Sequence, residues 1–501
     1  MKIKDIQNLI SFDDKLTDKW LDDVDVWKSG LSPFQYKKQR GYIAAGTGTG
    51  KTHFLNVKLI PHLIKNYDAR FFIYVAPETM LVSKASKKKF MLLLETNNII
   101  PREYFNESVK NCFDDLDLLT DNNWDTYKRP SYMTLTDSKF RDQIESLLLE
   151  LKHKGLLEKT WIFIDEGAVG SVSAAEWYKD VYGTHNPEYK GKKYKMIGKC
   201  LKDIGGLMLF LPNETNEMLD DEIGTNDYTM INSFPTKDEM LYRTAHYNPT
   251  QWFDKETPAI DTISDVFNST MSDQLKQDAM YHDLIKKGIA LDTSEVNLNP
   301  KRGVIGKLET KYKNKIKNER DFIKSELKKA NFPTHWDFKI AFIDGKSVDL
   351  YQLSNGSVIS IETPKEYGDD DVVSDLRNHD NLLRVLFVTN KAGMGVDVTN
   401  FYDAFVLRIP VGLDNDGKPT ILLGLNYLGR VMRAKITHEQ LSPFFKDGQE
   451  KLYERYYAFV NGFTPWLPRS TYWESTIEKV HNTFNSVLRM ITALRGDVDE
   501  N

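Results

Sequence analysis

The chain has 501 residues, of which 41% are hydrophobic and 28% are charged. These fractions are typical of a soluble globular protein, and the length predicts two or three domains. The net charge is −5, so any contact with nucleic acid must depend on local basic patches rather than on the field of the whole chain.

The two cysteines, Cys112 and Cys200, are far apart in sequence and do not form a metal-type pair. This argues against a disulfide framework or a zinc site and fits a reducing cytosol. No apolar run approaches 18 residues and the N-terminus lacks a secretion signal, so we expect a cytoplasmic protein without a membrane partner.

Five short apolar runs in the first half predict β-strands. They are Tyr42–Ala44, Phe71–Val75, Tyr132–Leu135, Trp161–Ile164 and Leu207–Leu211. Between them lie longer stretches with helical spacing, such as residues 143–159. Strands that alternate with helices predict a parallel sheet covered on both faces, with a ligand at the carboxyl ends of the strands.

The stretch AAGTGTGKTHF, from Ala44 to Phe54, follows the first predicted strand and precedes a helical pattern. In this order the glycines let backbone N–H groups approach a phosphate, Lys51 can neutralise the β and γ charges, and Thr52 can coordinate Mg²⁺. The loop therefore predicts a nucleotide site. The alternative is a structural glycine turn.

The fourth strand ends in WIFIDEGAVG. Asp165 at the end of this strand can hold Mg²⁺ through water, and Glu166 can orient and deprotonate an attacking water molecule. An Asp-Glu pair after a strand is common in solvated turns, so this prediction depends on the phosphate loop upstream.

A second series of strands is predicted in the second half, at residues 303–308, 338–343, 382–388 and 404–410. It indicates a second β/α domain without a phosphate loop of its own. Two segments stand out there, TNKAGMGVD (Thr389 to Asp397) and NYLGRVMR (Asn426 to Arg433). Arg430 and Arg433 lie three apart and could stabilise charge on a γ-phosphate. The alternatives are a tight turn for the first segment and a solvated helix face for the second.

The order of these segments resembles the motifs of superfamily 2 helicases and translocases of the DEAD/DEAH type, from about Pro33 to Arg433. The fold that this resemblance implies is α/β, with two tandem RecA-like domains, a helical insertion and a helical, aromatic-rich C-terminal tail. AGTGTGKT matches motif I, APETMLVSK (Ala76 to Lys84) motif Ia, and DEGA (Asp165 to Ala168) motif II. TNKAGMGVD matches motif V and NYLGRVMR matches motif VI.

The resemblance implies that ATP and Mg²⁺ are the cofactors. The implied catalytic residues are Lys51, Asp165, Glu166, Arg430 and Arg433, with Thr52 and Asp165 as metal ligands. The implied nucleotide-binding residues are Gly46, Thr47, Gly48, Thr49, Gly50, Lys51, Thr52, Gln35, Gly395 and Asp397, with Gln39 as the alternative to Gln35 for reading the base.

Nucleic acid is the implied partner, with DNA expected rather than RNA. The implied contacts are Thr79, Lys84, Thr134 and Lys391, and such contacts would be made largely to phosphates. Two basic stretches, residues 83–90 and 188–199, could add to the binding surface or could be solvated loops.

Three features depart from the family pattern, and in the family two of them, position 168 and motif III, help to connect hydrolysis to strand separation. Position 168 is Ala, motif VI opens with Asn426, and no motif III is recognisable at Pro212 to Thr215. Strand separation, as opposed to translocation or remodelling, is therefore less well supported than ATP hydrolysis.

The sequence predicts five regions. They are a leader at 1–32, an ATP-binding domain at 33–235, a helical insertion at 236–300, a second motor domain at 301–439 and a helical extension at 440–501. We expect an ATP-dependent helicase or translocase of DNA replication, recombination or repair, of a compact size that resembles phage helicases. The alternatives are an RNA helicase, a phage-type packaging ATPase and a nucleotide-switched binding protein.

Overall fold

The computed structural model describes residues 3, 12–29, 40–44, 51–76, 84–105, 110, 112–114, 116, 129–165, 203–211, 229–231, 246–248, 250–253, 259–289, 296–307, 325, 327, 332–343, 347–378, 380–388, 398, 400–406, 412–413, 419–420, 431 and 433–469. The chain divides into two compact units, and each is described by itself. The N-terminal unit comprises residues 13–236 and 412–418, and the C-terminal unit comprises residues 1–12, 237–411 and 419–501.

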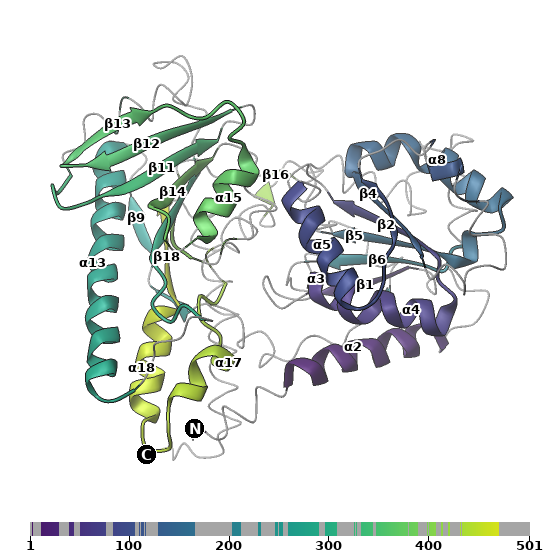
Figure 1. Ribbon diagram of the computed structural model, residues 1–501, viewed down its shortest axis with the longest axis horizontal. Coiled ribbons are helices and arrows are strands. Elements are labelled where there is room, and N and C mark those ends of the chain that lie inside the picture. Colours follow the sequence, from purple (N-terminus) through teal and green to yellow (C-terminus); the bar gives the residue numbers. More distant parts are fainter. Residues whose placement is uncertain are drawn as a thin grey trace. The chain divides into compact units, whose positions relative to one another are not determined.

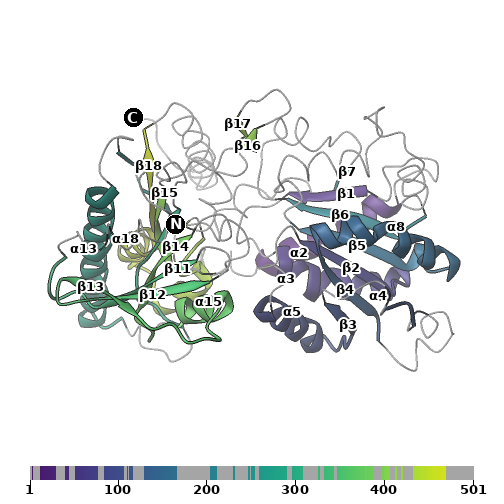
Figure 2. The same cartoon turned by 90° about the horizontal axis from the view of Figure 1, so that it is seen from above.

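The N-terminal unit is built on a seven-stranded sheet in the order β3-β4-β2-β5-β6-β1-β7. Its strands are β1 (Arg40–Ala44), β2 (Phe71–Ala76), β3 (Arg102–Phe105), β4 (Ser131–Thr136), β5 (Thr160–Asp165), β6 (Gly206–Leu211) and β7 (Thr229–Met230). Each neighbouring pair is parallel, and the order of β1, β6 and β5 is visible in Figure 2. Central strands β2, β4 and β5 are buried over nearly their whole length, as expected when helices cover both faces.

Helices cover both faces of this sheet (Figure 1). They are α2 (Phe12–Ser29), α3 (Lys51–His53), the π-helical segment η2 (Phe54–Leu59), α4 (Ile60–Tyr67), α5 (Lys84–Thr96) and α8 (Asp137–His153), with a 3₁₀ turn η3 (Leu157–Lys159). One apolar cluster joins α2, η2, α4 and α5 to side chains such as Phe72, Phe163 and Phe210. Successive strand residues point to opposite faces, and α8 packs on β4 and β2.

The C-terminal unit is built on a nine-stranded sheet in the order β13-β12-β11-β14-β10-β15-β18-β8, with β9 also paired to β18. Its strands are β8 (His246–Tyr247), β9 (Gln251–Phe253), β10 (Gly303–Lys307), β11 (Phe338–Ile343), β12 (Val348–Ser354), β13 (Ser357–Ile361), β14 (Leu383–Val388), β15 (Phe401–Val406) and β18 (Gly462–Pro468). Pairs β11–β12 and β12–β13 are antiparallel and the others are parallel. Two further short strands, β16 (Gly412–Leu413) and β17 (Pro419–Thr420), pair with each other.

The helices of the C-terminal unit are α13 (Ala259–Lys286), α15 (Asp369–Arg377), α17 (His438–Leu441), the 3₁₀ turn η7 (Ser442–Phe444) and α18 (Glu450–Val460). The N-terminal part of α13 packs through Phe267 on an aromatic cluster that includes Phe338 and Phe387. A second cluster joins the end of α13 to α17 and α18, and Ile3 is buried in it. None of the helices in the described ranges is both long and apolar enough to cross a membrane.

The predicted fold class, two mostly parallel sheets flanked by helices, is confirmed by these two sheets. Every apolar run predicted as a strand lies in or overlaps a strand. The ranges expected to be a helical insertion and a helical tail are not purely helical, because β8, β9 and β18 lie in them. These strands extend the second sheet next to β15, and residues beyond 469 lie outside the described part.

Candidate nucleotide site

The candidate site lies at the carboxyl edge of the N-terminal sheet. Strand β1 ends at Ala44, before the predicted phosphate loop, and strand β5 ends at Asp165. Both strands pair with β6, where Ala44 is level with Leu211 and Asp165 with Phe210. The two strand ends are therefore at the same edge and two strand spacings apart, about 10 Å.

The helix after the loop begins at Lys51, two residues before His53, where the sequence predicts the helical pattern to begin. Lys51 is half-buried and Thr52 is exposed. The buried side chain of Asn56 donates a hydrogen bond from Nδ2 to the carbonyl oxygen of Thr52 at 2.7 Å. This bond lies where the helix widens into the π-helical segment Phe54–Leu59, and it ties the first turn to the buried side of the helix.

Asp165 is held in position by a residue that the sequence analysis missed. The hydroxyl of Tyr74, on β2, donates a hydrogen bond to Oδ2 of Asp165 at 2.5 Å. Tyr74 is 5% exposed and its ring packs on Phe90, with 5.2 Å between the ring centroids. The sequence carries no signal for this contact, because it depends on the register of β2 against β5.

The charge of Asp165 also influences the buried Tyr132. Burial raises the pKa of Tyr132 well above its usual value, and the nearby negative charge of Asp165 raises it further. Tyr132 therefore remains a neutral phenol at physiological pH. Asp165 thus acts on two tyrosines of the sheet, on Tyr74 of the adjacent strand β2 through a hydrogen bond and on Tyr132 of β4, the next strand beyond β2, through its charge.

The donor set at this edge fits Mg²⁺ with a nucleotide phosphate. A threonine hydroxyl and a carboxylate are the oxygen ligands that Mg²⁺ takes in such sites, where it keeps water and phosphate oxygens as its remaining ligands. Among the described residues, no group of three or more His, Cys, Asp or Glu side chains is placed to hold a metal ion. Any Mg²⁺ held by Thr52 and Asp165 would therefore share its shell with the nucleotide.

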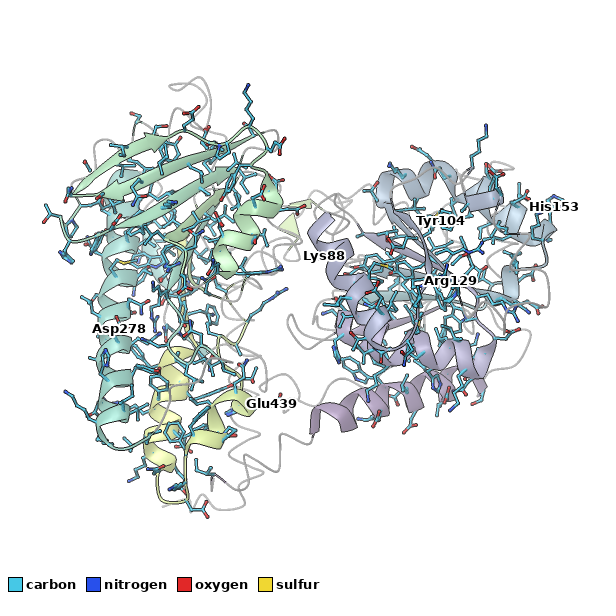
Figure 3. The ribbon with its side chains drawn as sticks, in the orientation of Figure 1. Lys88, Tyr104, Arg129, His153, Asp278 and Glu439 are labelled. Atoms are coloured by element: carbon cyan, nitrogen blue, oxygen red, sulfur yellow. The ribbon has the colours of Figure 1, made fainter. Side chains whose placement is uncertain are left out.

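The predicted nucleic-acid contacts that the structure describes differ in their position and burial. Thr134 is 4% exposed in the middle of β4, so its burial does not favour contact with a strand in solvent. At the end of the same strand Thr136, which is not one of the predicted contacts, caps α8 by accepting a hydrogen bond from the N–H of Lys139 at 3.4 Å. Helix α5 begins at Lys84 and presents Lys88 to solvent (Figure 3).

In the C-terminal unit, Arg433 is half-buried, and its neighbours Val431 and Ala434 are buried. The structure thus describes the end of the segment that carries the predicted arginine pair. The other predicted site residues lie outside the described residues. They are Gln35, Gln39, Gly46, Thr47, Gly48, Thr49, Gly50, Thr79, Glu166, Lys391, Gly395, Asp397 and Arg430.

A buried carboxyl group, Asp403 on β15, lies in the same unit. Its two oxygens accept hydrogen bonds from Nε1 of Trp466 at 2.9 Å and from the hydroxyl of Thr270 at 2.8 Å. Burial raises the pKa of Asp403 to about 6, although these two bonds and the charge of Arg302 act in the opposite direction.

Residues 7–167 match the family model of the type III restriction enzyme res subunit. The match includes the segment from Ala44 to Phe54 and the strand that ends at Asp165. It confirms the resemblance to superfamily 2 helicases that the motifs predict. A search of curated proteins found no match.

Several solved structures are similar to the chain over most of its length. One is S. cerevisiae Dbp5 bound to RNA and ADP BeF3, at 12% identity and a TM-score of 0.39, covering 93% of this chain and 97% of that one. Another is the DUF1998 helicase MrfA bound to DNA, at 12% identity and a TM-score of 0.49, covering 93% of this chain and 48% of that one. With these identities and TM-scores, the similarities carry no information on activity or substrate.

Proposed function

We propose that this chain is a superfamily 2 motor, which hydrolyses ATP and uses the reaction to move along a nucleic-acid strand. One observation carries the proposal. The loop-bearing strand β1 and the strand that ends at Asp165 reach the same edge of one parallel sheet, where α/β proteins bind their ligands.

Each residue of the proposed site has a chemical role. Lys51 neutralises phosphate charge, while Thr52 and Asp165 hold Mg²⁺, which when bound screens the charge of the phosphates. Glu166 orients and deprotonates the attacking water. Arg430 and Arg433 stabilise the charge that develops on the γ-phosphate in the transition state.

We propose DNA as the track. The family matched by residues 7–167 is a subunit of a restriction enzyme, and restriction enzymes act on DNA. The chain would then belong to DNA replication, recombination or repair. Lys84 and the exposed Lys88 on α5 are proposed phosphate contacts, which give affinity without reading the sequence.

We further propose translocation or remodelling in preference to strand separation. The support is in the sequence, where Ala168 and the unrecognisable motif III depart from the family pattern. In the family, these elements help to connect hydrolysis to strand separation.

The test is steady-state ATP hydrolysis by the purified protein, alone and with single-stranded DNA, duplex DNA, branched DNA and RNA. We expect strong stimulation by DNA. Arg433→Ala should lower the stimulated rate by roughly 100-fold or more, because an arginine that stabilises transition-state charge is worth at least this much. Stimulation by RNA alone would reassign the track.

Hydrolysis that is indifferent to every polymer would overturn the motor. It would favour a packaging ATPase, or a nucleotide switch if Glu166→Gln also leaves the slow rate unchanged.

A further inference from the structure

The backbone that follows the predicted arginine pair is held by a buried asparagine from the C-terminal extension. Asn461, which ends α18, is fully buried. Its Oδ1 accepts hydrogen bonds from the N–H groups of Lys435 at 2.7 Å and Ile436 at 3.0 Å. Its Nδ2 donates to the carbonyl oxygen of Ile436 at 2.9 Å. Three bonds from one side chain therefore fix two consecutive residues, 25 and 26 positions away in sequence.

Lys435 makes a further hydrogen bond within the same segment. Its Nζ donates a hydrogen bond to the carbonyl oxygen of Val431 at 2.6 Å. Both residues are buried, and Arg433 lies midway between them in sequence. The two interactions fix the backbone on either side of Arg433, at Val431 and at Lys435 and Ile436.

Aromatic rings and a second cation surround the ammonium group of Lys435. Its Nζ lies 4.9 Å from the ring centroid of Tyr402, and the guanidinium carbon of Arg302 lies 4.2 Å from the same centroid. Arg302 also donates a hydrogen bond to the carbonyl oxygen of Phe459 at 2.9 Å, near the end of α18. The end of α18, strand β15 and the start of β10 are thereby joined around this segment.

Fold stability alone gives little reason for a lysine at this position. Burial lowers the pKa of Lys435 well below its usual value, and the charge of Arg302 lowers it further, against the opposing effect of Asp403. Burying such a group is costly, and an apolar side chain of similar size is often at least as stable. The contact that an apolar side chain cannot make is the hydrogen bond to the Val431 carbonyl.

We propose that Asn461 and Lys435 are positioning residues for ATP hydrolysis, which act by fixing the direction in which the backbone presents Arg433. The inference rests on the proposed function. It gives the C-terminal extension a role in the reaction, because α18 and β18 supply the asparagine and its support.

A double-mutant cycle tests this role. The variants are Asn461→Ala, Lys435→Met, Arg433→Ala and the two doubles that combine Arg433→Ala with each of the others. We expect Asn461→Ala and Lys435→Met to lower kcat roughly tenfold while KM for ATP stays within about twofold, because the interaction lost is one made in the transition state. Neither change should lower kcat further when Arg433 is already alanine.

A matched control is Thr270→Val, which removes a buried hydrogen bond to Asp403 in the same unit but does not touch residues 431–436. It should lower the unfolding temperature and leave kcat unchanged. Amide hydrogen exchange gives a readout independent of activity, and the amides of Lys435 and Ile436 should exchange faster in Asn461→Ala than in Thr270→Val. If Asn461→Ala does not fold, Asn461→Asp, which keeps the acceptor for both N–H groups, takes its place and should show a smaller loss of kcat.

The outcomes separate the two proposals. A wild-type protein without ATPase activity would overturn both. An active wild type that loses its rate in Arg433→Ala, combined with losses from Asn461→Ala that are the same in both backgrounds, would overturn only the positioning role. Equal losses of kcat in Thr270→Val and Asn461→Ala would also overturn it, because a general loss of packing would then explain the result.

Discussion

The two units bury different kinds of polar group. Among the described residues, the N-terminal unit buries only uncharged polar side chains, namely Asn56, Ser131, Thr134, Thr136 and Thr160. The C-terminal unit buries four charged ones, namely Arg302, Arg384, Asp403 and Lys435. In the first unit, the charged side chains of the candidate site, Lys51 and Asp165, lie at the edge of the sheet. In the second unit, charged side chains lie in the interior.

This difference shows two ways of placing a functional side chain. A parallel sheet with apolar faces places residues at its carboxyl edge by strand register alone, and strand order then sets their spacing. The backbone around Arg433, which itself forms a single β-bridge, is fixed in addition by the buried polar contacts of Lys435 and Asn461. Such contacts are specific only when every group is satisfied.

The largest expected effect is on the rate of ATP hydrolysis and comes from a substitution in the candidate site of the N-terminal unit. Lys51→Ala should lower the rate of ATP hydrolysis by at least about 100-fold, because the loss of a preorganised charge at the phosphates removes transition-state stabilisation. Lys58→Ala is the matched control, since Lys58 lies on the same helix and its Nζ pairs with Asp18 at 3.2 Å. Equal rates in the two variants, measured at saturating ATP, would contradict the assignment of Lys51.

The second prediction tests the buried charge of the C-terminal unit. Because burial raises the pKa of Asp403 to about 6, the stabilising contribution of its protonated form is complete below about pH 4 and is lost as the pH rises through about 6. The loss is on the order of 3 kcal/mol. Asp403→Asn should therefore be more stable than the wild type at pH 8, and the difference should shrink towards pH 4.

The hydrogen bonds of Asp403 agree with this direction. The hydroxyl of Thr270 is within reach of both Asp403 and the carbonyl oxygen of Val266, at 2.8 Å each, but it has one proton to donate. A protonated Asp403, or an asparagine, can donate to Thr270 while Thr270 donates to Val266. Urea denaturation at several pH values measures the free energy of unfolding. A wild type that is more stable than Asp403→Asn at pH 8 would contradict the prediction.

A third prediction compares the two sheets directly. In each, a glycine is paired across neighbouring parallel strands with a buried aromatic residue, Gly206 with Trp161 and Gly306 with Phe387. A Cβ atom at either glycine would lie 2.5 Å from the ring. Gly206→Ala and Gly306→Ala should each cost about 1–3 kcal/mol of unfolding free energy, as overpacking does.

The control for both is Gly368→Ala, because a Cβ atom there would meet nothing within 4 Å. It should change the denaturation midpoint little. If Gly306→Ala were as stable as the wild type and Gly206→Ala were destabilised, the C-terminal sheet, with its mixed strands, would accommodate an added methyl group more easily than the all-parallel sheet.

The smallest expected effect concerns the orientation of Asp165. Tyr74→Phe removes the hydroxyl that donates to Oδ2 of Asp165 and keeps the ring that packs on Phe90. Removing a partner that orients a metal ligand typically costs about 10-fold or more. We expect a rightward shift of that size in the Mg²⁺ dependence of ATP hydrolysis. An unchanged Mg²⁺ titration would show that the hydroxyl does not orient the carboxylate.

Much of the fold could be predicted from the sequence, because most strands are compact apolar runs between polar segments. The β12–β13 hairpin was missed although its signal is present. Asn355 and Gly356 stand between the two strands with φ values of 50° and 75°, and an Asn-Gly pair is the usual sequence of such a tight turn. Strands β8 and β9 are two and three residues long, too short to show a period.

Strand β18 was missed for a different reason. It contains Pro465 and Pro468, and proline within a run argues against a strand. The positions of Lys51, Thr52 and Asp165 relative to their strands and helix could be predicted, because each motif touches the element that places it. The contacts from Tyr74 to Asp165 and from Asn461 to Lys435 could not, because each joins segments that only the folded chain brings together.

The place of β18 has a consequence for how the protein is made. The described strands of the N-terminal sheet all lie between residues 40 and 230, so this sheet can form while the ribosome is still producing the rest of the chain. The C-terminal sheet has β18 between β15 and the short strands β8 and β9. Strands β8 and β9 can therefore pair only after β18 has been synthesised, more than 200 residues later. Until then, the growing chain exposes unpaired strand edges.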